Sequence, residues 1–175
     1  PPGTDRRGIG GAVRGVEEQG GRERLQRHHR RGRQDRQGVL RVHLLALERK
    51  IGGTFPAGHP VLTWLVEHVS DVISKYMIGH DGKTGYERLF GRPVREEGLE
   101  FGETLHWHHK KTQDMNVVLD ARWSSGVWLG RRWGGTVHQV FSNGKIHDIR
   151  GIQRRPRADR WRKEALEAVT ATPWN

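Results

Sequence analysis

The chain has 175 residues, enough for one modest domain with extensions. It carries 31 Lys and Arg against 20 Asp and Glu, and this net charge of +11 favours polyanionic partners such as DNA, RNA or an acidic membrane surface. The absence of cysteine excludes disulfide scaffolds, thiol nucleophiles and Cys-ligated zinc, and the longest apolar run, residues 61–66, is too short to span a bilayer.

The N-terminal region is basic and lacks aromatic residues. Residues 1–50 hold 12 Arg and one Lys against six acidic residues, and no Phe, Tyr or Trp. Such a segment has little from which to build a core, so we expect residues 1–37 to form a mostly disordered Arg/Gly-rich tail. An amphipathic helix over residues 37–50 is then predicted by apolar residues at helical spacing: Leu40, Leu44, Leu47 and Ile51.

A longer helix is predicted to begin at Pro60, because a residue without an N–H fits the first helical position. Gly79 is expected to end it. The residues expected to face the core are Leu62, Leu65, Val66, Val69, Val72, Ile73 and Tyr76. The residues expected on the opposite face are Glu67, His68, Asp71 and Lys75.

Thr84 and Glu87 have the spacing of a capping box, which predicts the start of a short helix. Gly91 and Pro93 are expected to close this helix, because neither residue continues a helical pattern.

From residue 99 onward apolar and polar residues alternate, a pattern typical of strands. We expect a turn at Ser124-Ser125-Gly126 and a two-residue hairpin at Asn143-Gly144. Four or five short strands at this spacing predict a small, strongly bent sheet or barrel. Asp159 is expected to cap a final helix. The apolar residues expected in the strands are Phe101, Leu105, Trp107, Val117, Val118, Leu119, Val127, Trp128, Leu129, Val137, Phe141, Ile146, Ile149 and Ile152.

Several motifs follow one another in a recognisable order. They are Ser74-Lys75-Tyr76, Thr84-Gly85-Tyr86-Glu87 with Gly91 and Pro93 after it, Phe101-Gly102-Glu103, Leu119-Asp120-Ala121-Arg122-Trp123, Gly126-Val127-Trp128-Leu129-Gly130 and the Asn143-Gly144 hairpin. This order resembles the carboxy-terminal half of Copia-type retrotransposon integrases over residues 55–157, with Gly85 where the family has a proline.

The resemblance implies that residues 55–92 are the last helices of an RNase H-like core, and that residues 99–155 form a small SH3-like barrel that helps hold DNA. The chemistry of the family needs two aspartates and a glutamate around paired divalent cations. The strands that would carry the aspartates do not occur in this chain. Neither Asp35 nor Glu48 has the surroundings of the catalytic glutamate, so we expect no enzymatic activity, no catalytic residue and no cofactor.

The expected fold class is α+β, with N-terminal helices followed by a small SH3-like antiparallel β-barrel and a C-terminal helix. Four segments are expected: a tail over residues 1–37, a helical segment resembling the end of an integrase core over 38–93, the barrel over 94–157, and a C-terminal helix and tail over 158–175.

Two basic segments interleave arginine with tryptophan, a combination that suits phosphate binding and stacking on bases. The alternative is a solvated charged face on which the tryptophan packs. The predicted nucleic-acid-binding residues are Arg131, Arg132, Trp133, Arg154, Arg155, Arg157, Arg160, Trp161, Arg162 and Lys163.

His106 and His108 fall on one face of a strand, a spacing that can bind zinc or copper if His138 or His147 supplies a third ligand. We favour the alternative, a solvated polar face of the sheet, and predict no metal site.

The sequence therefore predicts non-catalytic DNA binding by a truncated, integrase-like protein, located in the nucleus if the resemblance holds. DNA is expected to be preferred over RNA as a partner, and no membrane span is expected. The alternative is a basic structural subunit of a larger assembly, either RNA-bound and ribosome-like or a protein-bound accessory subunit.

Overall fold

The computed structural model describes residues 35–96, 98–108 and 123–174. The strand expected around Val117-Val118-Leu119 lies outside these ranges, as do residues 1–34 of the tail expected over residues 1–37. Residues 35–37, also expected in that tail, belong instead to a helix. Residues 35–51 are helical, close to the predicted 37–50. Leu47 on this helix is buried, and Gly52 follows with a φ of 64°, a left-handed conformation that glycine adopts without strain.

Helix α2, Pro60–Tyr76, begins where the proline predicted it. The imidazole of the N-cap residue His59 accepts a hydrogen bond from the Val61 backbone N–H at 3.2 Å. The predicted apolar face is only partly right, because Val66 and Tyr76 are exposed. Its most deeply buried apolar residues are Val61, Trp64, Leu65 and Val69. The helix ends three residues before Gly79, because Met77 is already in an extended conformation.

Helix α3, Gly85–Phe90, has the capping box that the sequence predicted. The Glu87 N–H donates to the Thr84 hydroxyl at 3.1 Å, and the Glu87 carboxylate accepts from the Thr84 N–H at 2.8 Å. Gly91 ends the helix in a left-handed conformation with a φ of 69°. Both ends of this six-residue helix are therefore determined by local side-chain and backbone chemistry.

Five strands form one antiparallel sheet in the order β4-β3-β2-β1-β5. The strands are β1 (Thr104–His108), β2 (Trp123–Arg131), β3 (His138–Ser142), β4 (Lys145–Ile149) and β5 (Ile152–Arg154). The protein is thus a mixed helix-and-sheet structure in which helices precede the strands, as expected. Strands β4 and β5 are the two edges of the sheet, yet only residues 150 and 151 separate them in the chain. The end of β4 and the beginning of β5 therefore lie close together, which requires a strongly bent sheet.

The hairpin at Asn143-Gly144 is confirmed, because both residues have positive φ values, 51° and 74°, and Ser142 pairs with Lys145. The turn expected at Ser124-Ser125-Gly126 is wrong, since all three residues lie within β2. A glycine is needed at position 126 because β3 packs too closely to leave room for a side chain, and not because the chain turns there. A Cβ on it would overlap the Val140 side chain and lie 2.7 Å from the Phe141 carbonyl oxygen on β3.

The chain ends in a short 3-10 helix, η1 (Arg157–Asp159), and helix α4 (Lys163–Glu167). A C-terminal helix is therefore present, but the cap predicted at Asp159 is wrong. That residue lies inside η1, and Arg162 precedes α4 without a side-chain capping bond.

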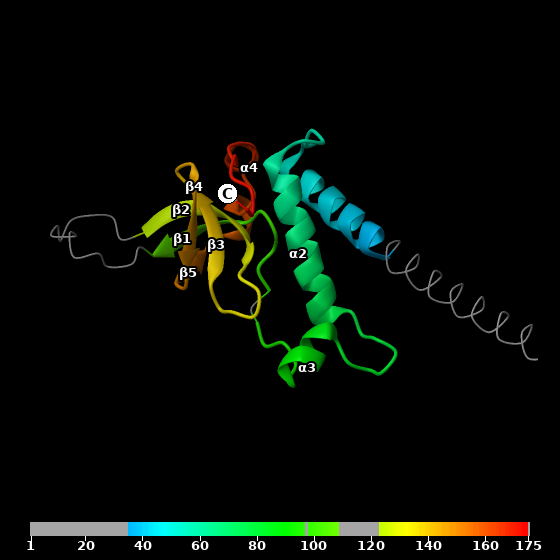
Figure 1. Ribbon diagram of the computed structural model, residues 1–175. Helices are drawn as coiled ribbons and strands as arrows, with labels where there is room; N and C mark the ends of the chain where they lie inside the picture. The colour runs from blue at the N-terminus through cyan, green and yellow to red at the C-terminus, as the bar shows by residue number, and fades with distance from the viewer. Residues whose placement is uncertain (1–34, 97, 109–122, 175) are drawn as a thin grey trace, which may run out of the picture. The chain divides into compact units, whose positions relative to one another are not determined.

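The larger core lies between α2, the sheet and α4, where Trp64 and Leu65 pack with Val127, Leu129 and Leu166. Figure 1 shows α2 running along the sheet, with α3 at its far end and α4 near its beginning. A second, separate core cluster on the sheet includes Leu105, Trp107 and Trp128. No helix in the described ranges has the length and apolar character needed to cross a bilayer.

Candidate nucleic-acid interface

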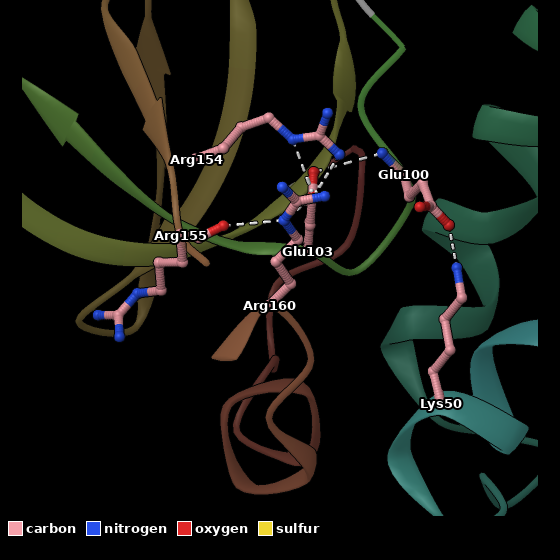
Figure 2. Close-up of polar contacts among 6 residues, drawn as sticks. All are labelled: Lys50, Glu100, Glu103, Arg154, Arg155 and Arg160. Carbon is pink, nitrogen blue, oxygen red and sulfur yellow. Dashed lines mark hydrogen bonds and ion pairs between the residues drawn. The ribbon is translucent and has the colours of Figure 1, made fainter. Parts of the chain in front are cut away.

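The C-terminal basic segment is organised by a buried carboxylate that sequence reasoning did not single out as a site. Glu103 is only 1% exposed. Its Oε1 accepts hydrogen bonds from Nε and Nη2 of Arg154 at 3.0 and 2.6 Å, and lies 3.3 Å from Nε of Arg160. Figure 2 shows both guanidinium groups turned toward this carboxylate. Two of the predicted phosphate-binding arginines therefore neutralise an internal acid.

The Arg155 side chain points away from Glu103 (Figure 2). It donates from Nη2 to the Ser125 hydroxyl on β2 at 2.6 Å. Its backbone carbonyl accepts from Nε of Arg160 at 2.8 Å. Ser125 also lies 3.3 Å from Nδ1 of His106, so these polar groups form a chain across neighbouring strands.

Beyond β5 the cations become more available. Arg157 and Arg162 are exposed, and neither forms an ion pair with any residue in the described ranges. Lys163 is exposed and lies 3.7 Å from Glu167, a loose pair one helical turn away. Trp161 is half-buried beneath the ammonium group of Lys50, which lies 4.1 Å from the ring centroid. The indole is therefore packed against the protein, which agrees with the alternative considered for this residue.

The basic hairpin side chains between β2 and β3 have different partners. Arg131 lies 3.4 Å from Glu96, and Arg132 donates from Nε to Asp148 on β4 at 2.8 Å. This hydrogen bond raises the pKa of Arg132, which stays charged in any case. Trp133 is 54% exposed. Arg154 and Arg160 therefore share one carboxylate, Glu103, whereas Arg131 and Arg132 each pair with a separate carboxylate.

The four candidate histidine ligands are held apart. His108 lies against Trp123, and His147 stacks on Trp107 with ring centroids 4.6 Å apart. Nδ1 of His138 accepts from the Trp128 indole at 3.2 Å. Burial lowers the pKa of His138 to about 4, with a smaller contribution from Arg131. Within the part of the chain that the structure describes, no group of three or more His, Asp or Glu side chains has the arrangement of a metal site.

A buried ionic cluster on α2 was also missed by the sequence. Lys75 is 6% exposed although it was expected on the polar face. Its ammonium lies 2.6 Å from Asp71 and 2.9 Å from Glu96. Burial alone would lower the pKa of Lys75, but the two hydrogen-bonded carboxylates raise it above its usual range. A signal existed in the i, i+4 spacing of Asp71 and Lys75, but Glu96 is recruited only by the fold.

This cluster borders a cavity of about 440 Å³ between the first helix, α2 and the segment before β1. His68 lies in its wall, with ring centroids 5.3 Å from Phe101 and 5.6 Å from Trp128. Burial lowers the pKa of His68 to about 4, assisted by the charges of His43 and Lys75. Near Lys75 the cavity wall holds two acidic groups, Asp71 and Glu96, and two basic groups, Lys75 and Arg131. Because these charges balance, the cavity does not favour binding of a phosphate.

The two carboxylates considered for catalysis have structural surroundings. Glu48 accepts a hydrogen bond from the Phe55 backbone N–H at 3.2 Å, which ties the end of the first helix to the loop that follows. Asp35 lies exposed at the beginning of the described part of that helix.

Comparisons of this chain with protein-family models, with curated proteins and with solved structures give no match.

Proposed function

We propose that this protein binds DNA through exposed basic side chains and does not cut it. One observation carries the proposal: Arg157 and Arg162 are exposed and form no ion pair with a described residue, while the buried acid nearby, Glu103, is already satisfied by other arginines. Guanidinium groups in this state can fork onto phosphate oxygens. The net charge of +11 adds a long-range attraction for any polyanion.

The relationship to retrotransposon integrases belongs to the same proposal. It is supported by the chain order of the motifs and by a coiled sheet whose two edge strands are consecutive, an arrangement expected if the five strands close into an SH3-like barrel. On this interpretation the protein is an integrase-like chain that holds DNA in the nucleus.

A basic structural subunit of a larger assembly is the second candidate. It is favoured by large apolar side chains that are exposed to water, among them Ile78, Leu89 and Trp123. A protein or RNA partner that covers such residues removes the cost of exposing them. The same net charge would serve contact with structured RNA.

Titration of duplex DNA and of structured RNA across a salt series distinguishes the two candidates. We expect duplex affinity that falls with salt and persists, although weaker, when residues 1–34 are removed. The truncation stops there because Leu47 is part of the core. In the double variant R157A/R162A the slope of log affinity against log salt should decrease by about 2, since two phosphate contacts are lost.

R88Q is the matched control, because Arg88 is exposed but already paired with Asp81, and its slope should equal that of the wild type. An unchanged slope in R157A/R162A would remove these residues from the interface. Binding of structured RNA alone, lost on removal of residues 1–34, would favour the second candidate.

A further inference from the structure

Two aromatic side chains from distant segments meet on the surface. Trp133, in the connection between β2 and β3, and Phe90, the last residue of α3, have ring centroids 6.4 Å apart. They are 54% and 37% exposed. Figure 1 shows the β2–β3 connection reaching toward the end of α2 where α3 lies. The two rings form an aromatic platform, and a large part of its surface is exposed to solvent.

Contacts of Phe90 with Tyr86 and with the turn at Gly134 fix the position of the platform. Phe90 packs on the buried ring of Tyr86 with centroids 4.5 Å apart, so α3 and its capping box fix its position. The turn after Trp133 approaches Phe90 closely at Gly134, where a Cβ would lie 3.1 Å from Cζ of Phe90 and the φ is 69°. A glycine at this position therefore allows the two segments to come together.

The charges around the platform suit a polyanion. Arg132, directly before Trp133, is 62% exposed and is held by Asp148. Arg92, two residues after Phe90, is exposed and makes no ion pair with a described residue. The two segments that form the platform therefore each supply an exposed guanidinium group for a negatively charged backbone, and that of Arg92 has no ion pair with a described residue.

A hollow of about 690 Å³ adjoins Trp133 between α2 and β2. Its lining includes hydroxyl, amide and carboxylate groups, namely Ser70, Ser74, Gln139 and Glu67. These groups can donate to and accept from the edge of a heterocycle. The same lining holds two carboxylates, Glu67 and Asp71, and two guanidinium groups, Arg131 and Arg132, so its formal charges balance. Donors and acceptors side by side suit the edge of a base, which carries both kinds of group.

We propose that the Trp133–Phe90 platform stacks unpaired nucleobases, so that the protein binds single-stranded nucleic acid at this surface. This inference rests on the proposed function and adds single-stranded nucleic acid to its ligands. In a duplex the faces of the bases are covered by their neighbours, so duplex DNA cannot use the platform. Every base has a stacking face, hence the platform does not select for sequence.

The test measures binding of oligothymidylate, oligouridylate and duplex DNA to the full chain and to W133A, W133F and W174A. Loss of one stacked base should weaken oligothymidylate binding about 5- to 100-fold in W133A. W133F should retain most of the affinity, because a ring remains. Trp174 is 72% exposed and is not part of the platform, so W174A is the matched control and should change affinity less than about twofold.

Duplex affinity should be the same in W133A and in the wild type. The thymidylate and uridylate arms show whether the strand is DNA or RNA, and weakening of either by W133A supports the platform. Equal single-strand affinity for W133A and wild type, with duplex binding intact, overturns this inference and leaves the proposed function standing. Absence of binding to every nucleic acid by the wild type overturns both, and the platform would then be a surface for protein. Equal unfolding midpoints for the four proteins confirm that a lost affinity is not a lost fold.

Discussion

At the scale of single residues, Glu103 shows how a charged side chain becomes part of a core. It precedes β1, and its backbone carbonyl accepts from the Trp128 N–H at 2.8 Å, so its position is fixed by the sheet. Its side chain then collects Arg154 and Arg160 from beyond the fourth strand. A buried carboxylate is tolerated only with such partners, because an unpaired charge loses its hydration without compensation.

Replacing this carboxylate with its neutral amide tests the role of Glu103. We expect E103Q to lower the free energy of unfolding by about 2–4 kcal/mol, because Arg154 and Arg160 are left beside a neutral group. Urea unfolding monitored by tryptophan fluorescence measures the change. The neighbouring Glu100 pairs with Lys50 at the surface, so E100Q should cost less than about 1 kcal/mol. Equal effects of E103Q and E100Q would show that the buried cluster does not stabilise the fold.

At the scale of elements, local chemistry accounts for the ends of α3 and for the β3–β4 hairpin. Thr84 and Glu87 satisfy backbone groups that a helix leaves open, and Asn143-Gly144 adopts the positive φ values that a tight hairpin needs. These elements were predictable because their determinants lie within four residues of each other. The path of strand β2 through Ser124-Ser125-Gly126 was not predictable in this way. Gly126 is needed there because the Val140 side chain on β3 leaves no space for a Cβ, and Val140 is distant in the sequence.

The capping box of α3 has a measurable contribution. T84A removes the hydroxyl that accepts from the Glu87 N–H and should destabilise the protein by about 1 kcal/mol. T84S keeps the oxygen and should lie within a few tenths of a kcal/mol of the wild type. Chemical denaturation of the three proteins makes the comparison. A T84S variant as unstable as T84A would mean that the methyl group, and not the hydrogen bond, stabilises this position.

At the scale of the whole molecule, two histidines connect the packing of the helices to that of the sheet. His68 on α2 and His138 on β3 both contact Trp128, and burial lowers the pKa of each to about 4. In the unfolded chain the same groups titrate near 6.5. The unfolded state therefore binds more protons between these values, and acid favours unfolding.

Stability should fall as the pH is lowered from about 7 to 4, with a loss of up to roughly 3 kcal/mol per histidine that is complete below the folded pKa. The difference between wild type and H68Q isolates one group from the carboxylates that titrate in the same range. We expect the wild type to lose more stability than H68Q between pH 7 and pH 5, as measured by urea unfolding. His80 is exposed, so H80Q should follow the wild type. Parallel curves for wild type and H68Q would contradict the assignment.

Local sequence patterns are sufficient to predict the beginning of α2 at Pro60, both ends of α3, the Asn143-Gly144 hairpin and the mixed helix-and-sheet class. Each follows from neighbours in the chain, because capping, turn geometry and periodicity act over a few residues.

The tertiary structure alone decided which charges are free. The sequence does not distinguish the paired arginines from the unpaired ones. In the structure, acidic residues far away in the chain form ion pairs with Arg131, Arg154 and Arg160. Neither Arg157 nor Arg162 forms an ion pair with a described residue. The meeting of Trp133 with Phe90, and the burial of Lys75 beside Glu96, have the same origin. Contacts between distant segments depend on how the sheet coils and where α2 packs, and no local pattern encodes that arrangement.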